Sequence, residues 1–237
     1  MIGCLCIHGF TGAPYEVEPL ADYLKSRHPE WMFRIPTLPG HGETLSLKGI
    51  KFKEWIACAE KEYLELAERC DEVYVIGFSM GGLIAGYLAA NYKVDRLVLL
   101  SAAAYYLNPR QMAAELREMA RDLINGTLEE NELFSRYKRK ITETPLSSAL
   151  QFRKLVAFIR PQLSMIQAPT FIAQGEMDGL VPPKSAEFLY ESIPAEQKKL
   201  AYIKESAHHI CHCREKAALF SQVDDFLEGI PALPESC

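Results

Sequence analysis

A serine placed between glycines provides the first chemistry that this chain could perform. Segment 77–81 reads Gly-Phe-Ser-Met-Gly and matches the G-x-S-x-G pattern. The apolar run Val73–Phe78 precedes the serine, and residues rich in alanine, leucine and isoleucine follow it. This is the strand, sharp turn and helix that the pattern requires, and the glycines leave space for the backbone to turn. We therefore predict that Ser79 is a nucleophile that attacks a carbonyl carbon.

A serine hydroxyl is a weak nucleophile until an imidazole accepts its proton, and a carboxylate must orient that imidazole. Where G-x-S-x-G forms such a turn, the acid and then the histidine follow the serine along the chain. Asp178 lies just after a late strand candidate, with Glu176 as a rival in the same loop. His208 and His209 follow the last strand candidate, and spacing alone does not separate them. We prefer His208, because two small residues precede it.

The same reaction needs two hydrogen-bond donors for the carbonyl oxygen as it becomes charged. The backbone N–H of Met80, the residue after the nucleophile, is one candidate. The other lies in the loop after the first strand, where segment 8–12 reads His-Gly-Phe-Thr-Gly and offers the N–H of Phe10. We expect His8 to pack this loop rather than to take part in the reaction.

Apolar runs of strand length alternate with stretches of helical period, as in a parallel sheet covered by helices. The predicted strands are Ile2–Ile7, Trp31–Ile35, Val73–Phe78, Leu97–Leu100, Thr170–Ala173 and Leu200–Ile203. Apolar residues at helical spacing predict helices at Val17–Leu24, Phe52–Cys70, Lys184–Ser192 and Leu219–Leu227. A further helix is predicted to begin near Gly81. We therefore expect an α/β fold whose sheet carries the candidate residues on its loops.

The alternation is interrupted between about Tyr105 and Arg160. This stretch has no convincing strand and only helical period, with apolar faces at 112–123, 134–141 and 152–159. The simplest account is an α/β core formed by 1–104 and 161–237, with a helical cap at 105–160. Its apolar side chains, Phe152 and Phe158 among them, could line a pocket for an acyl chain, although helical spacing first of all predicts cap core.

Composition limits the classes of partner. The 237 residues suffice for one large domain, and a net charge of −5 without a basic block excludes the basic face that nucleic acid requires. The uncharged run Val73–Tyr92 is long enough to span a membrane, but its glycines and polar side chains favour a strand, a turn and a buried helix. With no leader-like start and seven cysteines at no disulfide-scaffold spacing, we expect a cytoplasmic protein without a stable membrane anchor.

Residue types that bind zinc crowd segment 208–213, which reads His-His-Ile-Cys-His-Cys. Adjacent residues rarely place four donors around one tetrahedral centre, and the chain has no second cluster with C-x-x-C spacing. We therefore expect no metal site here. We also expect no organic cofactor, because acyl transfer to water needs none.

With these residues in hand, the chain resembles the small bacterial carboxylesterases and monoacylglycerol lipases of the α/β-hydrolase superfamily. The resemblance rests on five motifs in order, in segments 4–12, 39–42, 77–82, 175–182 and 206–208. It implies an α/β-hydrolase fold, esterase or lipase activity on acyl chains, a triad of Ser79, Asp178 and His208, and Phe10 and Met80 as oxyanion donors. It also favours His208 over His209, since that family places its histidine directly after a small pair.

The expected substrate is a small ester with an apolar acyl chain of short to medium length, with monoacylglycerols among the candidates. A thioesterase or a carbon–carbon bond hydrolase could use the same triad. Haloalkane dehalogenase and epoxide hydrolase chemistry are disfavoured, because those reactions use a carboxylate where Ser79 stands. A binding protein without activity is a third alternative, and the presence of all three triad candidates disfavours it.

Overall fold

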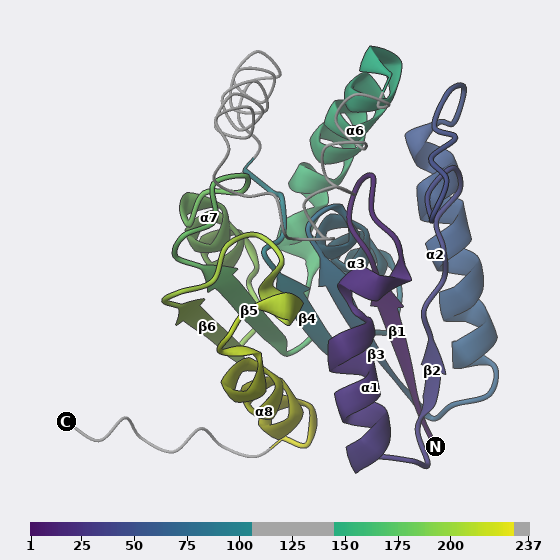
Figure 1. Cartoon of the computed structure of the whole chain (residues 1–237). Helices are drawn as coiled ribbons and strands as arrows, with labels where there is room; N and C mark the ends of the chain where they lie inside the picture. Colours follow the sequence, from purple (N-terminus) through teal and green to yellow (C-terminus); the bar gives the residue numbers. More distant parts are fainter. Residues whose placement is uncertain (106–144, 230–237) are drawn as a thin grey trace.

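A single six-stranded sheet forms the centre of the molecule in this computed structural model, which describes residues 1–105 and 145–229 (Figure 1). Every neighbouring pair of strands is parallel, in the order β2-β1-β3-β4-β5-β6. The strands are β1 Ile2–Ile7, β2 Met32–Arg34, β3 Glu72–Phe78, β4 Arg96–Leu100, β5 Thr170–Gly175 and β6 Lys198–Ile203. All six predicted strands are thereby confirmed.

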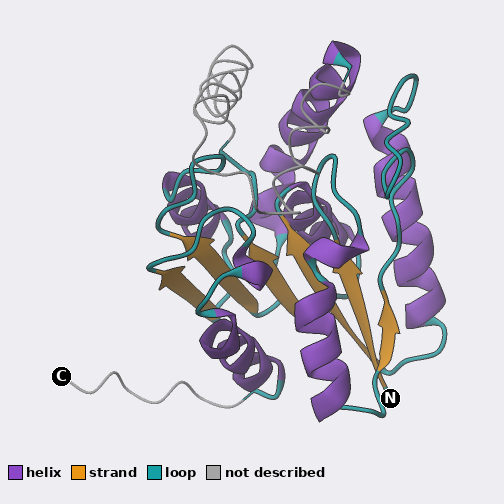
Figure 2. Ribbon diagram, in the orientation of Figure 1, coloured by secondary structure: helices purple, strands orange, loops and turns teal. Residues whose placement is uncertain are grey.

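Helices cover both faces of the sheet (Figure 2). The longer ones are α1 Glu18–Arg27, α2 Phe52–Ala67, α3 Met80–Asn91, α6 Leu146–Ile159, α7 Lys184–Ser192 and α8 Lys216–Leu227. Short 3₁₀ turns lie at Pro14–Glu16, Arg160–Met165 and Ile210–His212. The predicted α/β fold is therefore confirmed. The helices predicted at 112–123 and 134–141 lie outside the described residues.

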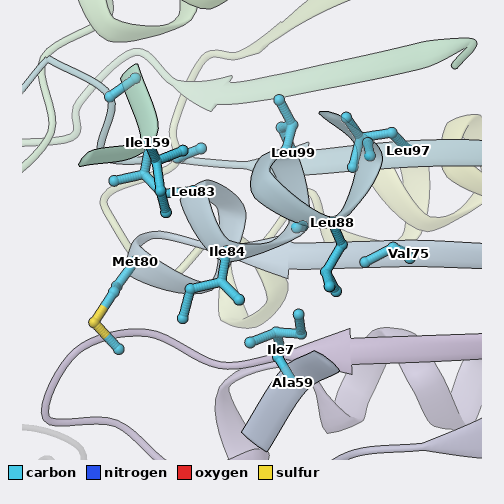
Figure 3. Packing of buried hydrophobic residues seen from close by; sticks show 14 of the residues in the cluster. Ile7, Ala59, Val75, Met80, Leu83, Ile84, Leu88, Leu97, Leu99 and Ile159 are labelled. Atoms are coloured by element: carbon cyan, nitrogen blue, oxygen red, sulfur yellow. The ribbon is translucent and has the colours of Figure 1, made fainter. Parts of the chain in front are cut away.

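Two apolar layers hold the helices to the sheet, because successive side chains of a strand point to opposite faces. On β1, Leu5 and Ile7 pack in the layer under α2, α3, α6 and α7, whereas Cys4 and Cys6 pack in the layer under α1 and α8. Figure 3 shows part of the first layer, with side chains of α3, of strands β1, β3 and β4 and of Ile159 in α6. Burying each such aliphatic side chain contributes about 1.5–3 kcal/mol.

The uncharged run Val73–Tyr92 is explained by this core. It forms most of β3, the turn that follows and α3, and nearly all of its side chains are buried between the sheet and the neighbouring helices. Across the ranges that the structure describes, no helix combines the length and the apolar character that crossing a bilayer demands.

Candidate active site

Ser79 lies in a strained turn between β3 and α3. Its φ of 54° is positive, which is rare for a residue other than glycine and is often found where the backbone serves a function. The turn depends on its glycines, since a Cβ on Gly77 would lie 2.2 Å from the carbonyl oxygen of Gly81 and one on Gly81 would lie 2.2 Å from that of Ile7. The Ser79 N–H donates to the Leu100 carbonyl at 2.9 Å, so the end of β4 holds the turn in place.

Three predicted site residues lie in one hydrogen-bonded chain. His208 Nε2 is 3.0 Å from Ser79 Oγ, and His208 Nδ1 is 2.8 Å from Asp178 Oδ2. Because a carboxylate oxygen accepts, the Nδ1–H donates to Asp178, which leaves Nε2 to accept from the serine hydroxyl. The three side chains come from loops at the carboxyl ends of β3, β5 and β6, the edge of a parallel sheet where ligands bind.

The two rivals considered from spacing lie elsewhere. Glu176 is exposed to solvent, and the ring of His209 packs 5.6 Å from the ring of Phe78. The structure therefore brings Asp178 and His208 into contact with each other, and His208 into contact with Ser79.

The Asp178 carboxylate is buried and receives four hydrogen bonds. Oδ1 accepts from the backbone N–H groups of Leu180 and Val181, both at 2.9 Å, and Oδ2 accepts from His208 and from Nε2 of Gln174. Burial raises the pKa of Asp178, but the hydrogen bond and charge of His208, together with the two backbone amides, outweigh burial and hold the pKa below its usual value. Asp178 is therefore ionised at neutral pH.

The loops of the acid and the histidine are in direct backbone contact. Gly175, the last residue of β5, makes this possible, since a Cβ there would lie 2.3 Å from the carbonyl oxygen of Ser206. The Met177 N–H donates to the same carbonyl at 3.1 Å, and the Glu176 N–H donates to that of Ile203 at 3.0 Å. These contacts fix Asp178 relative to His208.

The loop after β1 is anchored at two points. The Leu38 N–H donates to His8 Nε2 at 3.0 Å, so Nδ1 carries the proton and donates to the Gly9 carbonyl at 2.9 Å. The Gly9 N–H in turn donates to Oε2 of the buried Glu16 at 2.9 Å. His8 thus packs the loop, as expected. The role of Glu16 was not predicted, because nothing in the local sequence shows that its carboxylate is buried against the Gly9 amide.

Two backbone amides near this turn have no hydrogen-bond acceptor in the described ranges; one directly follows Ser79, and the other directly follows Gly9, whose added Cβ would lie 3.1 Å from Ser79 Cβ. The N–H groups of Phe10 and Met80 donate no hydrogen bond within the described ranges. Met80 is the first residue of α3, and the first amides of a helix have no acceptor in the helix itself. The N-terminus of α3 also favours negative charge at this place.

Aromatic rings gather next to these amides. The ring of Phe10 is stacked on that of Phe152 in α6, with centroids 5.2 Å apart, and meets the edge of Trp55 at 5.7 Å. Phe152 thus packs against the ring of Phe10, whereas Phe158 is exposed. Leu155 and Ile159 of the same helix are fully buried in the core. Helix α6 therefore connects the core to the loop of Phe10.

The histidines and cysteines of segment 208–213 contact different neighbours. His212 Nε2 lies 2.9 Å from the Tyr15 carbonyl, and Cys211 is fully buried, which raises its thiol pKa well above the usual value. Within the described ranges, three ligand atoms of the kind that bind metals gather only at His28, Asp224 and Glu228. There the Asp224 carboxylate is already bonded to His28 Nε2 at 2.6 Å and to Arg27 Nε at 2.9 Å.

Comparison with known proteins gives consistent matches over most of the chain. The model of the family described as serine aminopeptidase, S33, matches residues 4–215. A thermostable monoacylglycerol lipase of Bacillus sp. (strain H-257) is 30% identical over 217 residues, which cover 87% of this chain and 82% of the relative. A carboxylesterase of Bacillus subtilis (strain 168) is 26% identical over 229 residues, with 95% and 92% covered.

Solved structures share the fold. A structure reported for LipS and LipT, two metagenome-derived lipolytic enzymes, superposes with a TM-score of 0.78 at 23% identity, covering 96% of this chain and 94% of that one. The monoacylglycerol lipase of Paleococcus ferrophilus gives a TM-score of 0.73 at 19% identity, with 97% and 95% covered.

Proposed function

The chain belongs to the serine aminopeptidase, S33, family and is an esterase-type hydrolase with the α/β-hydrolase fold. From this premise, we propose that Ser79, His208 and Asp178 form its catalytic triad. The observation that carries the proposal is the chain of two hydrogen bonds from Ser79 Oγ through His208 to Asp178. It joins a nucleophile, a base and an acid that orients the base.

In the proposed reaction, Ser79 Oγ attacks the ester carbonyl carbon while His208 Nε2 takes the hydroxyl proton. The carbonyl oxygen becomes negatively charged and accepts hydrogen bonds from the Phe10 and Met80 amides. The tetrahedral intermediate then releases the alcohol, which takes its proton from His208, and an acyl-serine remains. A water molecule, deprotonated by His208, attacks the acyl-serine, and the carboxylic acid leaves with Ser79 restored.

We propose esters with apolar acyl chains of short to medium length as substrates, monoacylglycerols among them. The stacked rings of Phe10 and Phe152 beside the site support an apolar acyl group, and the names of the two bacterial relatives agree with it. We also propose that 105–160 is a helical cap inserted into the α/β core of 1–104 and 161–237, and that it is joined to this core through α6, whose Leu155 and Ile159 are buried there.

The test is hydrolysis of p-nitrophenyl esters from acetate to palmitate, and of monoacylglycerols, by the wild type and by Ser79→Ala. Loss of the nucleophile should lower kcat by about 10⁴-fold or more. Ser101→Ala is a matched control, because Ser101 is a buried serine at the end of β4 whose hydroxyl has no partner among the described residues. Its kcat should stay near that of the wild type.

Mass spectrometry after treatment with a fluorophosphonate checks the nucleophile directly. An adduct on Ser79 is expected, and an adduct on another residue contradicts the assignment. Activity with thioesters but not with esters would move the function to a thioesterase. An activity maximum at acetate would contradict the apolar acyl pocket.

A further inference from the structure

Gln174 contacts Asp178 at the same oxygen that binds His208. Its Nε2 donates to Asp178 Oδ2 at 2.9 Å, and this oxygen also accepts His208 Nδ1–H at 2.8 Å. Gln174 lies near the end of β5 and is fully buried. We propose that Gln174 is a positioning residue, which holds Asp178 Oδ2 toward His208 and weakens the attraction of the carboxylate for the protonated imidazole. This inference rests on the proposed function, because it concerns the acid of the proposed triad.

The neighbours of the Gln174 amide fix its orientation. Besides Asp178 Oδ2, its Nε2 faces the carbonyl oxygens of Val181 at 3.0 Å and Gly175 at 3.4 Å. All three neighbours are acceptors, so the reversed amide would place Oε1 against three oxygen atoms. Gln174 Oε1 itself has no hydrogen-bond partner in the described part of the chain. The interactions of this buried amide are therefore donations from its NH₂ group.

Gln174 completes the hydrogen bonding of the carboxylate. The backbone amides of Leu180 and Val181 hold Oδ1, while Gln174 and His208 share Oδ2. Without Gln174, the His208 imidazole would be the one remaining donor to Oδ2 among the described residues. The Asp178 side chain has no exposed surface, so bulk water does not reach it to replace a lost donor.

This hydrogen bond also weakens the electrostatic attraction between the Asp178 carboxylate and the protonated imidazole. The positive end of the Gln174 NH₂ dipole lies on Oδ2 and offsets part of the negative charge that faces His208. A carboxylate that lacks this donor attracts the imidazolium more strongly and so favours the protonated form of the ring. A protonated His208 cannot accept the Ser79 proton. Gln174 thus favours the neutral ring, the form that acts as the base.

The test compares Gln174→Met, which keeps the length of the side chain and removes the donor, with the wild type. The acid limb of the kcat/KM profile for a p-nitrophenyl ester should move to higher pH by about 0.5–1 unit. We expect kcat to fall about 10-fold at neutral pH with KM nearly unchanged, because Gln174 acts through Asp178 and not on the substrate. Gln174→Asn, whose amide is too short to reach Oδ2, should move the limb the same way and replaces Gln174→Met if that variant does not fold.

Thr170→Val is the matched control for loss of stability. Thr170 is a buried residue at the other end of β5, and its hydroxyl donates to the Ala168 carbonyl at 2.8 Å. This variant should melt at a lower temperature and keep the acid limb of the wild type. An acid limb that is unmoved in both Gln174 variants would overturn the inference while leaving the proposed function intact.

A readout that does not need activity separates the two proposals. The proton NMR signal of His208 Nδ1–H should shift in Gln174→Met, since Oδ2 then binds only the imidazole, and it should not shift in Thr170→Val. If the wild type hydrolyses no ester, the proposed function fails, and this signal still decides whether Gln174 acts on the Asp178–His208 pair. An unchanged signal overturns the inference.

Discussion

Gly12→Ala should disturb the loop that carries the Phe10 amide, because it displaces the side chain of Glu16 in the following 3₁₀ turn. An added Cβ on Gly12 would lie 1.8 Å from Oε2 and 2.3 Å from Cδ of Glu16. Glu16 is only 4% exposed, so its carboxylate cannot swing into water without leaving its place. The Gly9 N–H, which donates to that oxygen at 2.9 Å, then loses its acceptor. Gly9 directly precedes Phe10, whose amide is a proposed oxyanion donor.

The size of the effect follows from the lost contacts. A hydrogen bond to a carboxylate contributes about 1.5–3 kcal/mol, so the melting temperature should fall by about 3–12 °C for a chain of this length. Displacing one oxyanion donor lowers kcat by about 10²–10³-fold. Gly12 has no positive φ, so the Cβ overlap is the source of the damage rather than a forbidden backbone.

Thermal melts and p-nitrophenyl ester kinetics measure both quantities. Gly179→Ala is the control in the loop of Asp178, because a Cβ there would meet nothing within 4 Å. In a chain that already carries Glu16→Ala, adding Gly12→Ala should cost little more, since the overlap is gone. Wild-type kcat and melting temperature in Gly12→Ala, or equal losses of Gly12→Ala with and without Glu16, would refute the reasoning.

Two further predictions concern stability. The Asp178 carboxylate has a pKa below its usual value in the folded chain, so its contribution to stability is present above the unfolded pKa of about 4 and is lost as pH falls through the folded pKa. Melts of the wild type and Asp178→Asn should therefore differ at pH 7 and converge once the pH is below the folded pKa. Asp224→Ala leaves the buried His28 and the half-exposed Arg27 without their shared carboxylate. It should lower the free energy of unfolding by about 2–3 kcal/mol and leave the ester kinetics unchanged below the melting transition. Urea denaturation measures the free energy of unfolding, and a wild-type value would contradict the prediction.

Strands with unbroken apolar sequences could be placed from the sequence, because burial on both faces leaves a local mark. Leu97–Leu100 is an example, and all four of its residues are fully buried in β4. The start of β6 could not be placed in this way, because Lys198 and Lys199 are on the outermost strand. The Nζ of Lys198 reaches the carbonyls of Tyr190 and Ile193, which no pattern of apolar residues records.

The turn that carries Ser79 was likewise predictable, since its glycines, strand and helix are contiguous in sequence. The residues that support the site were not, because their contacts depend on how loops meet. Gln174 lies just past the predicted strand Thr170–Ala173, and no local pattern indicates that its amide contacts Asp178. The partners His28 and Asp224 are separated by 196 positions, and only the packing of α1 against α8 brings them together.

The order in which the strands are translated has a consequence for the nascent chain. Strands β1 to β4 and the turn of Ser79 precede β5 and β6, which add one after the other to the same side of the sheet. His208 follows Ser79 by 129 positions, roughly ten seconds of translation at the usual rate. Throughout that interval the ribosome holds a chain whose serine has no base beside it. Under the proposed triad, the serine therefore becomes reactive only after the segment that carries Asp178 and His208 has emerged and folded.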